Sequence, residues 1–390
     1  MLAAKGEKAS GYISRIEAEM NDSDIEAGLT NLLNDYRDYR QEILEECKNH
    51  QHVIFYGCGA ILKSIQESWK KHVGVPISYT CDSSPAKWGK TYADSRCISP
   101  SQLLEIRDDS IIFLTIGDFR PVYEDLKVKG FKSVKQLFKY DLDAADHIPR
   151  EAPKELVAKL LETWALLADE KSRRVFCAIV NRVLGNESYI NEMVDVQEGD
   201  QYFPADIMTL KNDEVLVDVG AYTGDTLLEF NKRTNGYFGA AICLELNRLN
   251  FEKLRITAQD INCNGEVITY NIGAWDEKAE VSYSLSESQS TLGCGEGRGY
   301  VEKLDTILSD WPATIIKMDI EGAEPNALQG AINTIKHGKP RLAISVYHDF
   351  RHLWQIPLLI KSMVPEYKIY LRHHTSLEYE TVCYAIAGDA

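Results

Sequence analysis

Three charged side chains interrupt an apolar run in the last quarter of the 390-residue chain, in the stretch IIKMDIEGAEP. Lys317, Asp319 and Glu321 alternate there with apolar residues, although a strand buried on both faces of a parallel sheet is normally apolar throughout. Charged groups at the carboxyl end of a central strand need a chemical use. Pro325 fits the first position of a helix, so Glu321 is expected in the loop above the sheet.

A glycine turn in the stretch VLVDVGAYTGDT, residues 215–226, is a second place where chemistry could occur. Gly220 and Gly224 would let a ligand approach the backbone closely, and a helix starting near Asp225 would present free N–H groups. Tyr222 stands where the dinucleotide-binding pattern G-x-G-x-x-G has its second glycine. This departure argues against a pyrophosphate lying on the turn.

Two carboxylates indicate what the turn would bind. Asp218, just before the turn, could neutralise a cationic ligand. Glu245 lies near the end of the segment CLEL and follows Gly224 by 21 residues, the spacing expected of an acid that binds both hydroxyls of a ribose. The implied ligand therefore carries a ribose and a positive charge. Ala274 and Trp275, which end the segment NIGAW, could form an apolar wall for a flat purine, or Trp275 could simply close the core.

The elements that must position these residues alternate between strands and helices. From residue 213 the segments that read as strands are EVLVDVG, AAICLEL, EVITYNIGAW, ATIIKMDI and RLAISVYH. The tail KIYLRHHTSLEYETVCYAI predicts two strands joined by a turn, so the last strand should run antiparallel. An earlier series that begins with HVIFYGCGAILKSI predicts a second parallel sheet of about four strands. We predict an α/β protein with a helical segment at 1–48, a smaller Rossmann-like domain at 49–140, a helical connector at 141–200 and a larger domain at 201–390.

Charge and composition exclude several classes of protein. The net charge of −16 would repel a phosphate backbone, so nucleic acid is not expected as a partner. The nine cysteines contain no C-x-x-C pair and predict neither a disulfide framework nor a zinc ribbon. No apolar run approaches the roughly 20 residues that span a bilayer, and no signal peptide is evident. We expect a cytoplasmic protein whose N-terminal amphipathic helices pack internally or form a homo-oligomer surface.

Together these segments resemble the FkbM family of S-adenosylmethionine-dependent O-methyltransferases. The resemblance runs from about residue 202 to residue 385 and rests on VDVGAYTGDT, Glu245, NIGAW, VEKLDTIL and IIKMDIEGAEPNALQGA. It implies a class I methyltransferase sheet, whose last strand is antiparallel, and S-adenosylmethionine as cofactor. The residues it implies at the cofactor are Gly220 and Gly224 under the methionine part, Asp218 near the sulfonium, Glu245 on the ribose and Trp275 beside the adenine, with Ala221, Tyr222, Asp225, Leu246, Ala274 and Asp319 around them.

Methyl transfer to a hydroxyl needs an aligned acceptor and a base for its proton. Asp319 is the first candidate for base or acceptor orientation, and His348 is the second. Glu321 and Lys317 are further candidates, or they form a structural ion pair. His373 and His374 could line the acceptor pocket or have an ordinary surface role. The spacing of His348 and His352 would place two imidazoles on one helical face, but the pattern lacks the H-E-x-x-H glutamate, so we do not predict a metal.

The first predicted sheet carries its own candidate ligand residues. Gly57 and Gly59 lie in the turn of HVIFYGCGAILK, although Leu62 replaces the third glycine, and Asp82 follows Gly59 by 23 residues. The segment CDSSPAKWGKTYADSRCISPSQLLE resembles the N-terminal Rossmann-like domain of sugar O-acyltransferases and other nucleotide-sugar modifying proteins. That domain would bind a nucleotide or sugar, or serve in docking.

The predicted function is O-methylation of a hydroxyl on a small-molecule or glycan acceptor, such as a sugar or a glycan or nucleotide-sugar precursor. Two other functional classes stay open at this stage. One is a nicotinamide-dependent or nucleotide-sugar-binding oxidoreductase that uses the first sheet. The other is a non-catalytic scaffold that keeps the fold.

Overall fold

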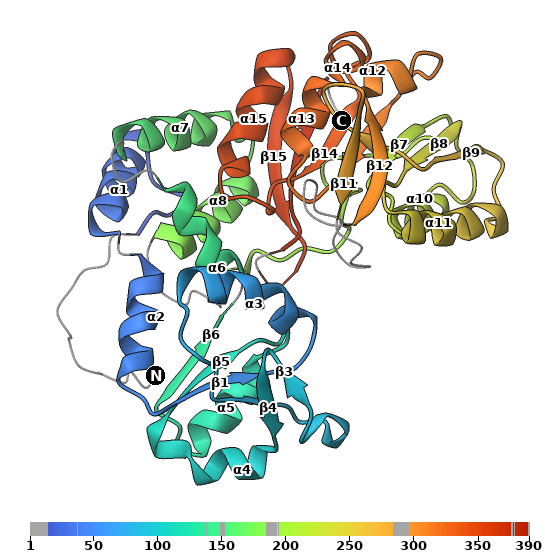
Figure 1. The fold of residues 1–390 in the computed structure, drawn as a ribbon. Coiled ribbons are helices and arrows are strands. Elements are labelled where there is room, and N and C mark those ends of the chain that lie inside the picture. The colour runs from blue at the N-terminus through green and yellow to red at the C-terminus, as the bar shows by residue number, and fades with distance from the viewer. Residues whose placement is uncertain are drawn as a thin grey trace, which may run out of the picture. The chain divides into compact units, whose positions relative to one another are not determined.

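The computed structural model describes residues 15–36, 38–137, 139–148, 153–184, 193, 195–283, 296–375, 377 and 379–388. The chain divides into two compact units (Figure 1). Unit 1 comprises Met1–Leu161 with Cys177–Tyr189, and unit 2 comprises Glu162–Phe176 with Ile190–Ala390. The predicted helical connector at 141–200 is thus shared between the two units.

Unit 1 contains an open sheet of six strands in the order β3-β4-β2-β1-β5-β6. Five of these strands pair in parallel, in the order β4-β2-β1-β5-β6. The edge strand β3 pairs with β4 antiparallel. The strands are β1 (His52–Tyr56), β2 (Tyr79–Cys81), β3 (Thr91–Tyr92), β4 (Ser95–Ile98), β5 (Ser110–Leu114) and β6 (Ser133–Gln136). Strand order reverses between β1 and β5, which is the position where ligands of open parallel sheets commonly bind.

Helices and short 3₁₀ segments connect the strands of unit 1. They are α1 (Asp22–Asp35), α2 (Tyr39–Lys48), α3 (Ala60–His72), η1 (Pro85–Lys87), α4 (Pro100–Glu105), η2 (Arg107–Asp109), α5 (Arg120–Val128), α6 (Lys139–Asp143) and η3 (Ala144–His147). In α3 the buried residues Leu62, Ile65 and Trp69 follow helical spacing. The Trp69 ring packs on Phe55 and Phe113 of the sheet, with centroids 4.9 and 5.3 Å away, and so closes the core of this unit. Two longer helices, α7 (Pro153–Leu166) and α8 (Glu170–Leu184), follow.

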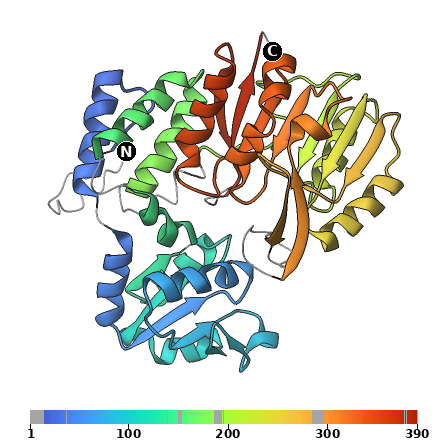
Figure 2. The ribbon, with the colours of Figure 1, turned by 45° about the horizontal axis from the view of Figure 1, so that its top comes forward.

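Unit 2 contains a sheet of seven strands in the order β15-β16-β14-β13-β7-β8-β9. β9, β8, β7, β13 and β14 pair in parallel, whereas β16 is antiparallel to both β14 and β15. In Figure 2 the colours run from yellow at the β9 edge through orange to red at the β15 edge. The strands are β7 (Val215–Val219), β8 (Ala240–Leu244), β9 (Glu266–Tyr270), β13 (Ile315–Met318), β14 (Arg341–Ser345), β15 (Lys368–His373) and β16 (Thr381–Ile386). This arrangement confirms the predicted sheet with an antiparallel last strand.

Strand order in unit 2 reverses between β7 and β13, the two strands that carry the glycine turn and the charged motif. A second, three-stranded sheet of β10 (Gly273–Ala274), β12 (Gly297–Glu302) and β11 (Ala279–Tyr283) follows β9. The helices are α10 (Asp225–Arg233), α11 (Arg248–Asp260), α12 (Leu304–Ile307), α13 (Glu324–Gln329), α14 (Ile332–Gly338) and α15 (His352–Met363). Ligands of such open sheets bind where the strand order reverses, so the topology directs attention to this edge.

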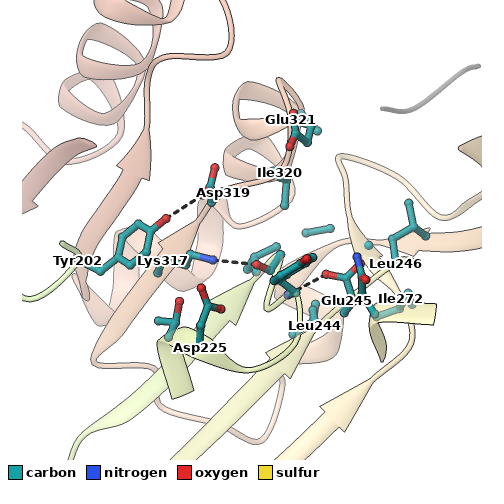
Figure 3. A pocket seen from close by; sticks show the side chains of 18 of the residues that line it. Tyr202, Asp225, Leu244, Glu245, Leu246, Ile272, Lys317, Asp319, Ile320 and Glu321 are labelled. Carbon is teal, nitrogen blue, oxygen red and sulfur yellow. Dashed lines mark hydrogen bonds between the residues drawn. The ribbon is translucent and has the colours of Figure 1, made fainter. Parts of the chain in front are cut away.

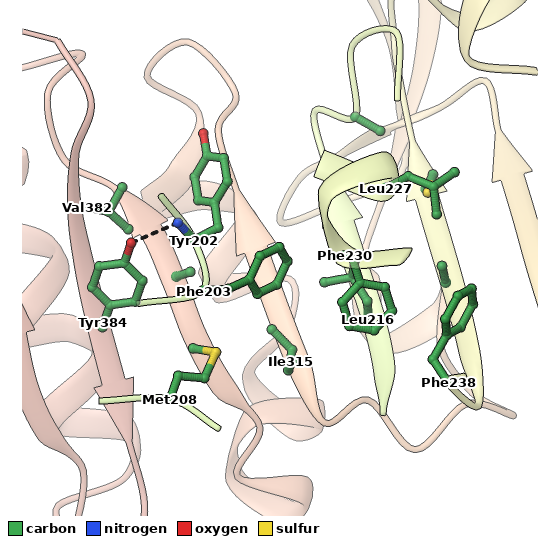
Figure 4. Close-up of a cluster of buried hydrophobic side chains, with 14 of the residues drawn as sticks. Tyr202, Phe203, Met208, Leu216, Leu227, Phe230, Phe238, Ile315, Val382 and Tyr384 are labelled. Atoms are coloured by element: carbon green, nitrogen blue, oxygen red, sulfur yellow. Dashed lines mark hydrogen bonds between the residues drawn. The ribbon is translucent and has the colours of Figure 1, made fainter. Parts of the chain in front are cut away.

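The core of unit 2 fixes a segment that precedes the first strand. Phe203 and Met208 of this segment pack with Phe230 and Leu216 in one buried cluster (Figure 4). The backbone N–H of Tyr202 donates to the hydroxyl of Tyr384 in β16 over 3.0 Å. This packing holds Tyr202, whose φ is +65°, at the carboxyl edge of the sheet.

Two further observations concern the described residues as a whole. No helix among them is both long enough and apolar enough to cross a bilayer. The eight described cysteines are all free thiols, seven of them buried.

Candidate active site

The glycine turn after β7 fits tightly between its neighbours. Gly220 has φ +77°, and a Cβ at this position would lie 2.0 Å from the carbonyl oxygen of Asp319. Gly224, with φ +93°, precedes α10, and its Cβ would lie 2.9 Å from Cγ2 of Thr257. Both positions therefore require glycine, and the backbone of Gly220 also lines the cavity at the carboxyl edge of β7.

A buried ion pair lies beneath this turn. Nζ of Lys317 is 2.9 Å from Oδ1 of Asp218 and donates to the carbonyl oxygen of Gly220 over 2.8 Å. Asp218 and Lys317 face each other across β7 and β13, and both side chains are almost fully buried. Burial lowers the pKa of Lys317, but the carboxylates of Asp218 and Asp319 more than offset this effect and raise it, so the lysine stays charged.

This pair differs from two sequence-based expectations. Asp218 was expected near the sulfonium of the cofactor, but it does not line the cavity and instead neutralises Lys317. Lys317 was expected to act in catalysis or to pair with Glu321, but its partner is Asp218. The reason is register, since residues opposite each other on neighbouring parallel strands are close whereas residues four apart along one strand are not.

Glu245 follows β8 and connects two loops of the site. Its carboxylate accepts the N–H of Tyr222 over 2.9 Å and the N–H of Asn247 over 2.7 Å. Burial raises the pKa of Glu245 to about 7, although the two backbone N–H groups and Lys317 act in the opposite direction. The carboxylate is therefore oriented toward the cavity at the position where an acid would bind ribose hydroxyls.

The apolar wall of the cavity comes from the turn after β9. Ile272, Gly273 and Ala274 line the cavity together with Leu246. Trp275 is only half-buried and is not among the lining residues, so it does not occupy the place beside the adenine that the resemblance implied. Its carbonyl oxygen instead lies where a Cβ of Gly330 would be, at 1.9 Å, which fixes the turn against α13.

Asp319 follows β13, accepts two hydrogen bonds from tyrosine hydroxyls and faces a histidine. The hydroxyl of Tyr202 donates over 2.7 Å (Figure 3), that of Tyr347 donates over 3.0 Å, and Nε2 of His348 lies 3.3 Å away. Burial raises the pKa of Asp319, but the charges of His348 and Lys317 and the two tyrosine hydroxyls outweigh it and lower the pKa. A carboxylate stabilised in this way orients its neighbours well and accepts a proton poorly.

His348 lies between two carboxylates. Its Nδ1 is 2.9 Å from Glu324 and its Nε2 faces Asp319, with Glu321 at 3.8 Å. Burial lowers the pKa of His348, but the three carboxylates raise it to about 10. The imidazole is thus a cation at neutral pH, and it does not line the cavity, in contrast to its expected role as an alternative base.

The histidine pair considered for a metal is arranged differently from a zinc helix. His352 is the first residue of α15, so His348 precedes the helix, and both rings face Glu324, with Nδ1 of His352 at 3.5 Å. Asp319, Glu324 and His348 are close enough together to hold an ion. The two nitrogens of His348 face different carboxylates, Nδ1 facing Glu324 and Nε2 facing Asp319.

Glu321, His373 of β15 and His374 directly after it lie in different places. Glu321 has φ +55° and lines the cavity. His373 is fully buried and its Nδ1 lies 2.8 Å from the hydroxyl of Thr381. His374 contacts the hydroxyl of Tyr384 at 2.9 Å and the carbonyl oxygen of Gly199 at 3.0 Å. Neither histidine lines the acceptor side of the cavity.

The cavity measures about 310 Å³, within the range of small-molecule sites. The cavity extends from the glycine turn, with Tyr222 and Asp225, to a polar end. Of that end, only Asp319 and Glu321 were predicted from the sequence. The residues of that end are Tyr202, Asp319, Glu321, Tyr347 and Glu380. Tyr202, Tyr347 and Glu380 were not singled out from the sequence. The available signal was that Tyr347 lies near the end of the predicted strand RLAISVYH and that Glu380 lies between the two strands predicted in the tail.

The comparisons with known proteins agree with this geometry. Residues 218–376 match the family model of the methyltransferase FkbM domain. A solved methyltransferase FkbM from Methylobacillus flagellatus KT is similar over 94% of this chain and 99% of its own, with 22% identity and a TM-score of 0.73, which shows that the fold is shared. No curated protein matches the chain.

Two other solved structures align over part of the chain only. A putative rRNA methylase from Clostridium thermocellum is 10% identical over 46% of this chain and 89% of its own, with a TM-score of 0.31. Fibrillarin from Aeropyrum pernix, solved with natively bound S-adenosylmethionine, is 8% identical over 45% of this chain and 67% of its own, with a TM-score of 0.30.

The sheet order and the family match define a class I S-adenosylmethionine-dependent methyltransferase. Within that class, residues 218–376 match the FkbM methyltransferase domain. The residues at the switch point fit the cofactor, because the glycine turn leaves backbone exposed and Glu245 places a carboxylate in the same cavity.

Gly220→Ala should remove cofactor binding. The added Cβ would meet backbone at 2.0 Å in a left-handed conformation, so we expect a loss of about 2 kcal/mol or more in the free energy of unfolding. Gly199→Ala is the matched control, since no atom lies within 4 Å of its added Cβ. Urea unfolding and calorimetric binding of S-adenosylhomocysteine would check both. Unchanged binding in Gly220→Ala would contradict the close approach at this turn.

Lys317→Met should destabilise unit 2 by about 3–5 kcal/mol, because it leaves Asp218 charged and unpaired in the core. The double variant Asp218→Leu/Lys317→Met should recover most of this loss, whereas Lys336→Met on the exposed face of α14 should be neutral. Equilibrium unfolding in urea measures all three. A double variant as unstable as the single one would show that the ion pair is not the source of the effect.

Proposed function

We propose that this methyltransferase transfers the methyl group to a hydroxyl oxygen, and that the acceptor is a sugar or a glycan or nucleotide-sugar precursor. The observation that carries the proposal is the composition of the cavity beyond the cofactor residues. Its lining there consists of three carboxylates and two tyrosine hydroxyls. Such groups accept and donate the hydrogen bonds that a polyol offers at several adjacent positions.

The charge of the cavity separates acceptor classes. The lining residues on the acceptor side carry carboxylates, and the nearby cation Lys317 is buried beneath the turn with Asp218. An acidic cavity of this kind disfavours an anionic group close to the reacting atom. A neutral sugar hydroxyl fits there, and the phosphates of a nucleotide sugar would need to lie elsewhere.

Different residues of this chain would bind the cofactor and the acceptor. Glu245, oriented by the N–H groups of Tyr222 and Asn247, would hold the ribose, and the glycine turn would contact the methionine part. When bound, S-adenosylmethionine supplies an activated methyl group on a sulfonium sulfur. Asp319, held by Tyr202 and Tyr347, would fix the acceptor end through these hydroxyls.

Transfer of labelled methyl from S-adenosylmethionine tests the proposal. The panel contains UDP-glucose, UDP-N-acetylglucosamine, dTDP-rhamnose, free glucose and rhamnose, with glucosamine and lysine as amine acceptors. We expect label on a sugar hydroxyl, located by the O-methyl signal in product NMR, with wild type and with the exposed control Glu266→Gln. Glu245→Ala should lose both the label and the thermal stabilisation by S-adenosylhomocysteine, which for wild type is about 2.7 kcal/mol at 100 times Kd.

The outcomes of this panel are distinct. Transfer to an amine alone would overturn the O-methyl assignment while leaving the methyltransferase class intact. Undiminished stabilisation of Glu245→Ala by S-adenosylhomocysteine would instead overturn the assignment of Glu245 to the ribose.

A second proposal concerns unit 1, which we infer binds a nucleotide or nucleotide sugar. The supporting observation is that Asp82, which follows β2, has the same bonding as Glu245. Its carboxylate accepts the N–H of Cys58 in the turn after β1 over 2.9 Å and the N–H of Ser84, two residues later, over 2.9 Å. Gly59, in the same turn, faces open space.

One difference favours an anionic ligand in unit 1. Nζ of Lys87 lies 2.8 Å from Asp82, so a positive charge stands at the rim of this turn. The glycine turn, the acid and the lysine together suit a ribose with phosphate attached. The oxidoreductase alternative would use the same residues with a dinucleotide.

Thermal shift with UDP-N-acetylglucosamine, UDP and NAD⁺ distinguishes these ligands. We expect UDP-N-acetylglucosamine to raise the melting temperature of wild type and of Glu245→Ala, and to have a smaller effect on Asp82→Asn. A response to NAD⁺ alone would favour the oxidoreductase reading. Equal responses of Asp82→Asn and wild type would remove Asp82 from the site.

A further inference from the structure

Glu380 brings a carboxylate to the cavity from outside every sequence motif. It directly precedes Thr381, the first residue of β16, and lines the cavity with Tyr202, Asp319 and Tyr347. The strand pairing accounts for this position, because the N–H of Val346 after β14 donates to the carbonyl oxygen of Thr381 over 2.9 Å. The antiparallel return of β16 thus delivers Glu380 to the edge where the parallel strands end.

One oxygen of Glu380 is held and the other is available. The amide of Gln201 donates a hydrogen bond to Oε2. Among the residues that the structure describes, Oε1 has no hydrogen-bond or ion-pair partner. The backbone at Glu380 is left-handed, with φ +67°, a conformation that residues with a Cβ adopt rarely and that often occurs at functional positions.

The other carboxylate and the imidazole nearby are occupied. Asp319 already faces two tyrosine hydroxyls and His348, and His348 has its two nitrogens directed at Glu324 and Asp319. A group that accepts a proton in the reaction needs a free lone pair directed at the acceptor. Of these three groups, Glu380 is the one with a free oxygen in the cavity.

We propose that Glu380 is the general base of the methyl transfer, an assignment that rests on the proposed O-methylation. The acceptor oxygen forms a bond to the methyl carbon while the bond from that carbon to sulfur breaks and its electron pair stays on sulfur. The hydroxyl proton passes to Oε1 of Glu380. The products are a methyl ether, a neutral thioether and a protonated glutamic acid, so charge and atoms balance without an added reactant.

The electrostatics of the cavity support this role. Burial, with a smaller contribution from the charge of Asp319, raises the pKa of Glu380 to about 7, although the hydrogen bond from Gln201 and the charges of His348 and Lys317 act in the opposite direction. A base with this pKa is ionised in part at neutral pH and still takes up a proton readily. Of the groups that face it, Asp319 has a lowered pKa, His348, Tyr202 and Tyr347 have raised ones, and Lys317 stays charged.

The pH profile of kcat tests the proposal, with each sugar of the panel above that accepts label. At saturating S-adenosylmethionine, kcat of wild type should rise through about pH 7 to a plateau, because the base must be ionised. Glu380→Gln should lower kcat by about 100-fold or more and abolish the rise. Its affinity for S-adenosylhomocysteine should match wild type, which separates Glu380 from Glu245, whose pKa is also about 7.

Two further variants separate catalysis from structure. Glu366→Gln, exposed before β15, should leave kcat and its pH profile unchanged. Gln201→Leu removes a hydrogen bond to the ionised form, so the rise in kcat should move to higher pH. A merely structural Glu380 would produce no such shift.

A measurement without acceptor keeps the inference testable if no sugar is labelled. In the complex with S-adenosylhomocysteine, the ¹³C signal of the Glu380 carboxyl, assigned by its absence in Glu380→Gln, should titrate between about pH 6 and 8. A midpoint below pH 5.5 would overturn the proposal. If wild type labels a hydroxyl and Glu380→Gln keeps the same kcat and pH profile, Glu380 is not the base while O-methylation stands. Label on an amine alone overturns both.

Discussion

The ammonium of Lys317 holds together the two strands between which the sheet reverses its order. It neutralises Asp218 on β7, donates to the carbonyl oxygen of Gly220 and lies 5.1 Å from the centre of the Tyr202 ring. A buried cation in this position gives the glycine turn a fixed place relative to the end of β13. Because Tyr202 in turn donates to Asp319, one charge connects the cofactor turn with the acceptor side of the cavity.

The buried carboxylates that surround the cavity of unit 2 fall into two pairs, according to whether a cation faces them. Asp319 and Glu324 face the His348 cation, and their pKa values are lowered despite burial. Glu245 and Glu380 have no cation within ion-pair distance among the described residues, and burial raises the pKa of each to about 7. The first pair stays ionised and holds the framework rigid. The second pair lines the cavity, where carboxyl groups that can change protonation are chemically useful.

The sequence predicted the sheet of unit 2 well because each strand carries its own signal. Apolar segments that alternate with helical segments along the chain predicted the parallel strands. The two strands predicted in the tail implied the antiparallel return of β16. The glycine turn and Glu245 could be located because the physical requirements there, a left-handed backbone and an acid at the end of the next strand, are local.

The rest of the site depends on contacts between distant segments. The partner of Lys317 follows from the register of β7 and β13, which no single segment specifies. Tyr202, Tyr347 and Glu380 reach the cavity from three separate segments, and their spacing along the chain carries no motif. His348 illustrates a different obstacle. Its type and position suited a base, but Glu324, four residues before Leu328 on the buried side of α13, makes it a cation, and that contact appears only on folding.

The two units place the same bonding pattern in different electrostatic settings. In each, an acid after the second strand accepts one N–H from the glycine turn and another two residues further along the chain. Lys87 lies on Asp82 in unit 1, and the bonds from this lysine and from the two N–H groups lower the pKa of Asp82. Glu245 in unit 2 has no such neighbour. Glu245, which has no lysine beside it, favours a cationic cofactor. Asp82 with Lys87 favours a ligand that carries negative charge beside its ribose. Under the two proposals above, the charge at this single position would distinguish the ligands of two related turns.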